Sequence, residues 1–246
     1  MLSLAPPSRA TERVVSLNLC TDQLLVLLAP EKVVALSTLA RDPALSFVAP
    51  EARQLPQVRA DAEAVVALRP DLVLAGQYGA QAAVAALKAR GVKVLQLGLP
   101  DSFDAIRSQV RALAAALGAE APGEALIAAM NRELAALPHP SPAPTAILLE
   151  PRGWTSSPGT LGDAVLRAAG YRDVGTGHAG LERLLAHPPD VLLTAEAPRF
   201  PSLATAMLEH PALRDLPRKR FAPALLTCAG PFTARAADEI APGRSP

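Results

Sequence analysis

A thirteen-residue phrase occurs twice in this chain of 246 residues, and its two copies begin 119 positions apart. Residues 63–75 read EAVVALRPDLVLA and residues 182–194 read ERLLAHPPDVLLT, and the two align without a gap. Each copy predicts a short helix opened by an acid and ended by Pro-Asp, then an apolar strand, because proline cannot continue a helix. One helix–strand unit used once in each half predicts two similar lobes with a ligand cleft between them.

The composition is typical of a globular protein with one large or two modest domains, because half of the residues are hydrophobic and no apolar run is long enough to span a bilayer. The net charge is +1, from 24 basic and 23 acidic residues, and aromatic residues make up 3%. A nucleic-acid partner is therefore not expected, since neither a basic face nor a stacking surface is evident.

The first ten residues, MLSLAPPSRA, contain no apolar segment behind a positively charged start. A secretory signal peptide is therefore not expected within these residues. Either the protein is cytoplasmic, or its signal has been removed or has been left out by the choice of start site; the sequence leaves these possibilities open.

Strand and helix patterns alternate along most of the chain, which predicts mostly parallel sheets covered by helices. Strands are expected at 14–19, 32–36, 72–75, 92–97, 145–150, 191–194 and 220–227. Helices are expected at 21–28, 61–68, 80–90, 102–117, 120–137, 160–169, 181–186, 202–209 and 233–240. The predicted fold is α/β, with two Rossmann-like lobes, 13–118 and 144–241, joined by a single long spine helix at 119–138.

The two cysteines, Cys20 and Cys228, are each expected just after a strand, at the edge of a sheet where α/β proteins bind ligands. They could be two small buried apolar residues. They could also face each other across the cleft, as a disulfide, as ligands of a soft metal or as ligand-contacting thiols. A nucleophilic cysteine is a third possibility.

Several aromatic residues also follow predicted strands. Trp154, the only tryptophan, lies in a small polar loop after the strand at 145–150, where a large ring is well placed to stack on a ligand. Tyr78, Phe200 and Phe232 follow other strands in the same way. The sequence contains no short catalytic or nucleotide-binding motif and no histidine pair at metal-binding spacing, so neither a histidine-based catalytic or metal site nor a resident cofactor is expected.

Five segments together resemble the substrate-binding proteins of ABC importers for cobalamin, haem and iron–siderophores, which are also called helical-backbone metal receptors. The segments are RVVSLNLCTDQLL at Arg13, DAEAVVALRPDLVLA at Asp61, LKARGVKVL at Leu87, WTSSPGTLGDAVLRAAG at Trp154 and LERLLAHPPDVLLT at Leu181. The resemblance runs from Arg13 to about Ile240. It implies a monomeric periplasmic protein, not an enzyme, that captures a metal chelate or corrinoid and delivers it to a permease dimer in the inner membrane.

The resemblance also implies roles for particular residues. Glu63 and Glu182 stand where acids of the family form salt bridges with permease arginines. Trp154 matches an aromatic ligand contact, and the segment around Cys228 matches the final loop of the cleft. The full set of expected ligand contacts is Leu19, Cys20, Leu39, Arg41, Gln77, Tyr78, Trp154, Thr155, Phe200, Cys228 and Phe232.

Two other classes of protein stay open at this point. One is a cytoplasmic α/β enzyme that uses Cys20 or Cys228 as a nucleophile. The other is a two-lobed scaffold that holds a metal cluster with cysteine ligands. Neither explains the paired acidic phrases except as helix starts, which acids favour because of the helix dipole.

Overall fold

The computed structural model describes residues 11–196 and 202–243, and it divides into two compact units. The first unit comprises residues up to 42 together with 48–98 and 109–125. The second comprises 43–47, 99–108 and the chain from 126 onward. Each unit contains one parallel four-stranded sheet with helices, as predicted. The lobe limits given above stay a prediction.

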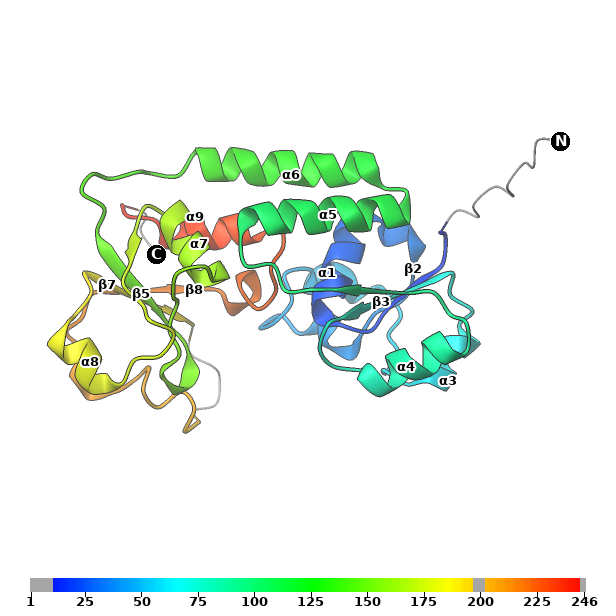
Figure 1. Ribbon diagram of the computed structural model, residues 1–246, viewed down its shortest axis with the longest axis horizontal. Helices are drawn as coiled ribbons and strands as arrows, with labels where there is room; N and C mark the ends of the chain where they lie inside the picture. Colours follow the sequence, from blue (N-terminus) through cyan, green and yellow to red (C-terminus); the bar gives the residue numbers. More distant parts are fainter. Residues whose placement is uncertain (1–10, 197–201, 244–246) are drawn as a thin grey trace. The chain divides into compact units, whose positions relative to one another are not determined.

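The first unit has strands β1 (Val14–Ser16), β2 (Val33–Ala35), β3 (Leu72–Gly76) and β4 (Val94–Leu97), in the spatial order β2-β1-β3-β4. Its helices are α1 (Leu19–Leu28), α2 (Ala49–Ala52), α3 (Ala62–Ala67) and α4 (Gln81–Ala89). Helix α1 lies on one face of the sheet, and α3 and α4 lie on the other (Figure 1). This arrangement follows from parallel pairing, since each crossover must pass over a face of the sheet.

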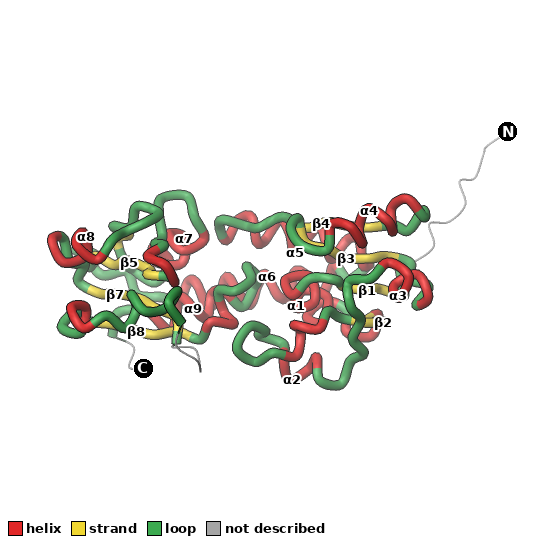
Figure 2. The backbone as a smooth tube through the Cα atoms, turned by 90° about the horizontal axis from the view of Figure 1, so that it is seen from below, coloured by secondary structure: helices red, strands yellow, loops and turns green. Residues whose placement is uncertain are grey.

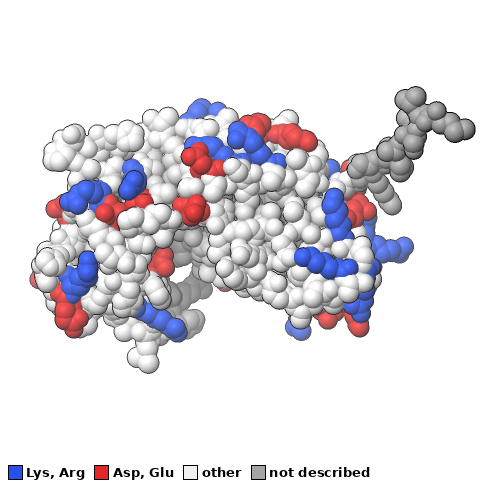
Figure 3. Space-filling view, viewed as in Figure 1, with Lys and Arg blue, Asp and Glu red and all other residues white. Residues whose placement is uncertain are grey.

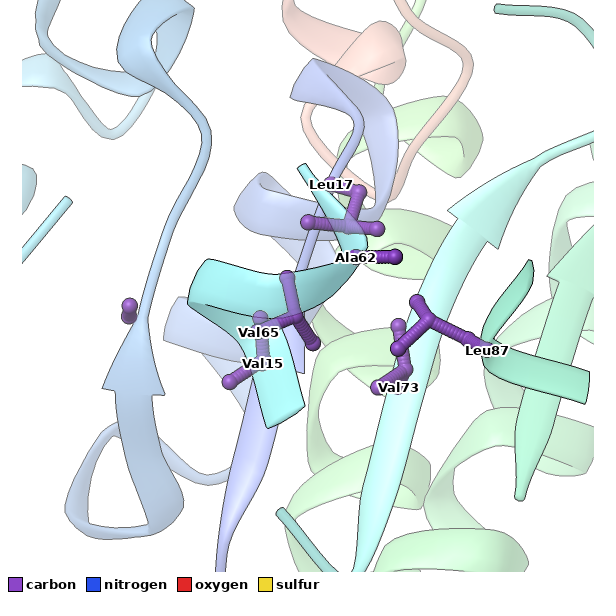
Figure 4. Packing of buried hydrophobic residues seen from close by; sticks show 7 residues of the cluster. Val15, Leu17, Ala62, Val65, Val73 and Leu87 are labelled. Carbon is purple, nitrogen blue, oxygen red and sulfur yellow. The ribbon is translucent and has the colours of Figure 1, made fainter. Parts of the chain in front are cut away.

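The core under α3 and α4 is made of alternate strand residues, because successive side chains of a strand point to opposite faces. Val15 and Val73 come from neighbouring strands, and Val65 of α3 and Leu87 of α4 pack onto them (Figure 4). All four side chains are buried. The pairing register of β1 and β3 therefore determines the face of the sheet on which α3 packs.

The second unit repeats this plan with β5 (Thr145–Leu149), β6 (Arg172–Asp173), β7 (Val191–Ala195) and β8 (Arg218–Phe221), in the order β6-β5-β7-β8. Its helices include α7 (Leu161–Ala168), α8 (Leu181–Ala186) and α9 (Thr233–Ile240). Figure 2 shows β5, β7 and β8 running side by side. Ile147, Leu184 and Leu192 form the core under α8.

The internal repeat is confirmed at the level of single residues. Its first copy is α3 followed by β3, and its second is α8 followed by β7. Val65 and Leu184 are equivalent in the repeat, and both are fully buried against their own sheet. Strand pairing is equivalent as well, since Val15 opposes Val73 and Ile147 opposes Leu192.

Two long helices, α5 (Phe103–Leu117) and α6 (Glu120–Ala135), confirm the predictions for 102–117 and 120–137. Within the first unit they approach closely at Gly123, where an added Cβ would lie 2.7 Å from the Cβ of Ala114. Arg111 and Glu124 join the two helices by an ion pair of 2.6 Å. No helix in the described ranges has the length and apolar character needed to cross a membrane.

The predicted first strand at 14–19 was too long. Strand β1 ends at Ser16, and α1 begins at Leu19 because the Asn18 side chain caps it, accepting a hydrogen bond of 2.9 Å from the Cys20 N–H. Leu19 and Cys20 therefore belong to the first turn of a helix, where the prediction had placed a strand and its exit.

The expected helix at 202–209 is wrong, because its described residues form a series of turns. The Thr205 hydroxyl accepts the N–H of Ser202, and the Thr205 N–H donates to the Ser202 carbonyl. Such local side-chain bonds compete with helix formation. The short strand β6 was not predicted, and the strand expected at 220–227 ends at Phe221, before Pro223.

Candidate functional site

Two pockets of the second unit meet at the carboxyl ends of its central strands, the edge where open parallel sheets bind ligands. One has a volume of about 310 Å³ and the other about 470 Å³, and they share Glu150 and Leu226. The smaller is lined also by Leu148, Trp154, Thr155, Ser156, Thr160, Leu161 and Gly162. The larger is lined also by Leu149, Pro151, Ala195, Glu196, Thr205, Leu208, Phe221, Pro223 and Thr227.

Trp154 is held at the smaller pocket by its backbone and by one neighbouring ring. Its carbonyl accepts the Glu150 N–H at 2.8 Å, across a turn in which Arg152 and Gly153 both have left-handed backbones. The His178 ring contacts the indole edge-on, with centroids 5.5 Å apart, and a His178 nitrogen lies 3.1 Å from the Arg152 carbonyl. The indole is nevertheless 57% exposed, so its face is available to a ligand.

The floor of the smaller pocket is fixed by buried polar contacts. The Ser156 hydroxyl donates to Asp173 at 2.8 Å and accepts the Leu148 N–H at 3.3 Å. Thr155 is also buried, and its hydroxyl accepts the Thr176 N–H. Thr155 was expected from the sequence, whereas Ser156, Glu150 and Asp173 were missed. Ser156 and Glu150 lie in or beside the quoted segment at Trp154, but no local pattern marked Asp173.

The first unit exposes two large residues after its own strands. Tyr78 follows β3 and is 65% exposed, and Leu39 follows β2 and is 49% exposed. Gln77 is exposed, and its carbonyl accepts the Gln81 side-chain amide at 2.9 Å. Arg41 has a structural partner, because its guanidinium donates to the carbonyls of Leu55 at 2.6 Å and Ala52 at 3.2 Å.

A buried carboxylate that sequence analysis missed lies at the same end of the first sheet. Asp22, in the first turn of α1, accepts hydrogen bonds from the Ser37 N–H at 3.0 Å and from the Ser37 hydroxyl. Burial raises the pKa of Asp22 to about 6, although the Ser16 and Ser37 hydrogen bonds oppose the shift. This contact ties α1 to the residue that follows β2.

Three expected ligand contacts are buried. Leu19, Cys228 and Phe232 each lie in the interior, and the Phe232 ring stacks on Phe47 with centroids 4.7 Å apart. The structure therefore gives Phe232 a packing role within the second unit. Neither Cys20 nor Cys228 is a free thiol. Phe200 lies outside the described residues.

The two repeated acids occupy equivalent exposed positions. Glu63 lies in the first turn of α3 and Glu182 in the first turn of α8. On the face drawn in Figure 3, basic and acidic side chains gather in small mixed groups. Among the described residues, no three His, Cys, Asp or Glu side chains come together as a group that could hold a metal.

Comparison with known proteins identifies the family to which this chain belongs. The family model described as "Periplasmic binding protein" matches residues 14–217, so the chain belongs to that family of binding proteins. The comparison with curated protein sequences finds no match.

Solved structures of similar fold include several periplasmic proteins. A periplasmic heme-binding protein from Pseudomonas aeruginosa is 25% identical with a TM-score of 0.70, over 96% of this chain and 95% of that one. The heme-binding protein RhuT from Roseiflexus sp. RS-1 is 26% identical with a TM-score of 0.69, over 93% and 95%. The vitamin B12 binding protein BtuF of Vibrio cholerae, at 17% identity and a TM-score of 0.64 over 93% and 94%, shares the fold.

Proposed function

We propose that this protein is the substrate-binding component of an ABC importer, and that it captures a metal chelate or corrinoid such as haem, cobalamin or an iron–siderophore. The observation that carries the proposal is the exposed face of Trp154 at the mouth of a pocket on the ligand-binding edge of the second sheet. The similar structures described as binding heme and vitamin B12 support this range of ligands.

Capture needs no chemical step. A large ligand is held when apolar and aromatic groups cover it and a few polar groups orient it. In the second unit, Trp154 and Leu226 supply apolar surface, and Glu150 and Thr160 supply polar atoms. In the first unit, Tyr78 and Leu39 are the proposed contacts because they are exposed after their strands. Binding without catalysis is part of the proposal.

The partner in this proposal is a membrane permease dimer, and the compartment is the periplasm, in keeping with the family. Glu63 and Glu182 are the proposed docking acids. Each is exposed in the first turn of a short helix whose inward face is buried. Because the two helices are copies of one unit, a partner with two equivalent subunits can use the same chemistry for both.

The test is a titration of Trp154 fluorescence with cobalamin, cobinamide, haem and ferric hydroxamate and catecholate siderophores, corrected for absorption by the ligands. One compound is expected to quench the signal saturably at one equivalent. Calorimetry of the same mixtures serves as the control, because it does not depend on the fluorophore. The absence of binding to every compound in both assays would contradict the proposed ligand class.

A further inference from the structure

Two carboxylates line the larger pocket of the second unit. Glu150 directly follows β5 and Glu196 directly follows β7, and these two strands pair with each other inside the sheet. Both residues are exposed. Within the part of the chain that the structure describes, neither carboxylate has a hydrogen-bond or ion-pair partner. The pocket of about 470 Å³ therefore carries two acids that the protein itself leaves available to a ligand.

The shared plan of the two units does not require an acid at either position. Counted along the paired strands, Glu150 corresponds to Asn18 in the first unit. Glu196 corresponds to Gln77 through the repeat. Both equivalents are uncharged amides, and the Asn18 side chain serves to cap α1. The negative charges thus belong to the pocket of the second unit and not to the common fold.

Most hydrogen-bond donors of the pocket lining are engaged within the protein. The Thr205 hydroxyl donates to the Ser202 carbonyl at 3.0 Å, and the Thr227 hydroxyl donates to the Pro223 carbonyl at 2.9 Å. A hydroxyl has one proton, so neither can donate to a ligand while these bonds last. Several lining residues also donate their backbone N–H groups to protein carbonyls: Glu150, Glu196, Thr205, Leu208, Leu226 and Thr227. The pocket therefore offers a ligand mainly the acceptor oxygens of its carboxylates.

Basic side chains do not offset these charges. Among the residues that the structure describes, no lysine, arginine or histidine lines either pocket. The basic residues of the nearby strand β8 have other partners: Arg218 and Lys219 donate to backbone carbonyls, and Arg220 pairs with Glu209 at 3.1 Å. An anionic group of a ligand would consequently meet acids without a cation between them.

A third acid lies beside the pocket. The Glu239 carboxylate accepts the N–H of Ala222, which follows the lining residue Phe221 at the end of β8. Burial raises the pKa of Glu239 and the charge of Glu196 raises it as well, although the Ala222 hydrogen bond opposes the shift. A cationic or donating group in the pocket would relieve this repulsion.

The free energy of covering these carboxylates depends on the ligand. Water solvates Glu150 and Glu196 in the ligand-free protein, because both are exposed. A carboxylate that loses water without gaining a donor is strongly destabilised, whereas an N–H or ammonium partner replaces the lost water. A ligand carboxylate at the same place would add repulsion between like charges.

We infer that the larger pocket receives a part of the ligand that carries hydrogen-bond donors, such as an amide or an ammonium group, and that Glu150 and Glu196 select such ligands over chelates with a carboxylate there. This inference rests on the proposed function and narrows its ligand class. It concerns the larger pocket alone, because the smaller pocket also includes the first turn of α7, whose backbone N–H groups are donors.

The experiment compares ligands that differ at the groups in question. Cobinamide carries amides around its corrin ring, and cobyrinic acid carries carboxylates there. Ferrioxamine B ends in an ammonium group, and its N-acetyl derivative lacks that charge. Calorimetry at pH 7.5 should show that the protein binds the amide or ammonium member of at least one pair about 10-fold more tightly than its counterpart, and more tightly than haem, which carries two propionates.

The variant that tests the role of the two acids is Glu150→Gln with Glu196→Gln, which removes both charges at nearly constant size. Its affinities for the two members of the pair should agree within about 2-fold. The matched control is Asp215→Asn, at an exposed acid that lines neither pocket, and it should keep the affinity ratio of the parent. Both proteins should melt like the parent, which excludes misfolding.

Two results would overturn the inference and leave capture of a metal chelate in place. One is binding of cobyrinic acid or haem as tight as that of the amide or ammonium ligands. The other is a double variant that keeps the affinity ratio of the parent. Failure of every ligand in the panel to bind would instead contradict the proposed ligand class, and this inference with it.

Discussion

Asp71 and Asp190 perform the same structural task in the two units. The Asp71 carboxylate accepts the backbone N–H of Arg13 at 3.1 Å, and the Asp190 carboxylate accepts the backbone N–H of Thr145 at 2.7 Å. Arg13 directly precedes β1 and Thr145 begins β5, the equivalent strand, so each aspartate fastens the first strand of its unit to the central strand of the repeat. The Pro-Asp pair thus ends a helix and anchors a strand.

The charge on Asp190 should stabilise the fold in a pH-dependent way. The Thr145 N–H, and then the Thr145 hydroxyl, lower the pKa of Asp190. A lowered pKa means that the stabilisation is present above the ordinary aspartate value of about 3.9 and is lost as pH falls through the folded value. Asp190→Asn should therefore lower the melting temperature at pH 7, and the difference from the parent should shrink below about pH 4. Asp101→Asn, at an exposed aspartate, is the control; equal differences at both pH values would contradict the prediction.

The buried carboxylate of Asp22 should have the opposite effect. Its pKa is raised from 3.8 to about 6, which corresponds to about 3 kcal/mol at 1.36 kcal/mol per unit. Because folding favours the neutral form, the free energy of unfolding should fall as pH rises from about 4 to 6 and level off above that.

Asp22→Asn removes this titration with little change of shape. We expect the variant to gain up to about 3 kcal/mol over the parent at pH 7.5 and to show no gain at pH 4. Urea unfolding at the two pH values measures the difference. If the free energy of unfolding differs between variant and parent by the same amount at both pH values, ionisation of Asp22 is not the cause.

Alanine substitutions at two glycines that follow helices should distinguish the effect of backbone strain from the effect of crowding. Gly91, after α4, has φ of 76° and open space where a Cβ would lie. Gly170, after α7, has φ of 93°, and a Cβ there would lie 2.5 Å from the Pro138 carbonyl oxygen. Gly91→Ala should cost about 1–2 kcal/mol from strain, and Gly170→Ala about 2–4 kcal/mol because crowding adds to it. If the two substitutions lower the free energy of unfolding equally in chemical denaturation, the contact with Pro138 adds no destabilisation.

Trp154 should dominate the affinity of the second unit for its ligand. Trp154→Ala removes the exposed ring and should weaken binding about 10-fold or more, and Trp154→Phe should lose less because a smaller ring remains. Calorimetry with the compound that quenches fluorescence measures both. The control is Leu203→Ala, at an exposed residue that lines neither pocket. If Trp154→Ala binds the ligand with the same affinity as the parent, Trp154 is not part of the binding site.

The repeated acids should serve docking and not capture. Replacing Glu63 and Glu182 together by lysine should abolish stimulation of the permease ATPase, because basic partners would then be repelled. Ligand affinity should be unchanged, since neither acid lines the two pockets described in the second unit. Replacement of Glu31, another exposed acid, by lysine controls for net charge. A weaker ligand affinity in the double variant would contradict separate roles.

The elements with strong periodicity were predicted closely from the sequence. Proline and glycine punctuation located α3, α4 and α8, and the amphipathic pattern located α5, because these signals depend on nearby residues alone. The prediction of a helix at 202–209 was wrong because the apolar content of this segment is typical of a helix, whereas the Thr205 hydroxyl forms local hydrogen bonds with the backbone of Ser202. The predicted element boundaries were wrong where a side-chain helix cap sets the boundary, as at Asn18.

By itself, the sequence determined the duplicated plan, the parallel βα architecture and the positions of Glu63, Glu182 and Trp154 at helix starts and strand exits. These follow from local backbone preferences and from a repeat that is visible without coordinates. Only the tertiary structure decided which side chains are accessible: Phe232 is buried on Phe47, Arg41 is bound to backbone carbonyls, and Val66 and Leu185 are exposed. Accessibility depends on contacts between residues far apart in the chain, and such contacts leave no mark in a local pattern.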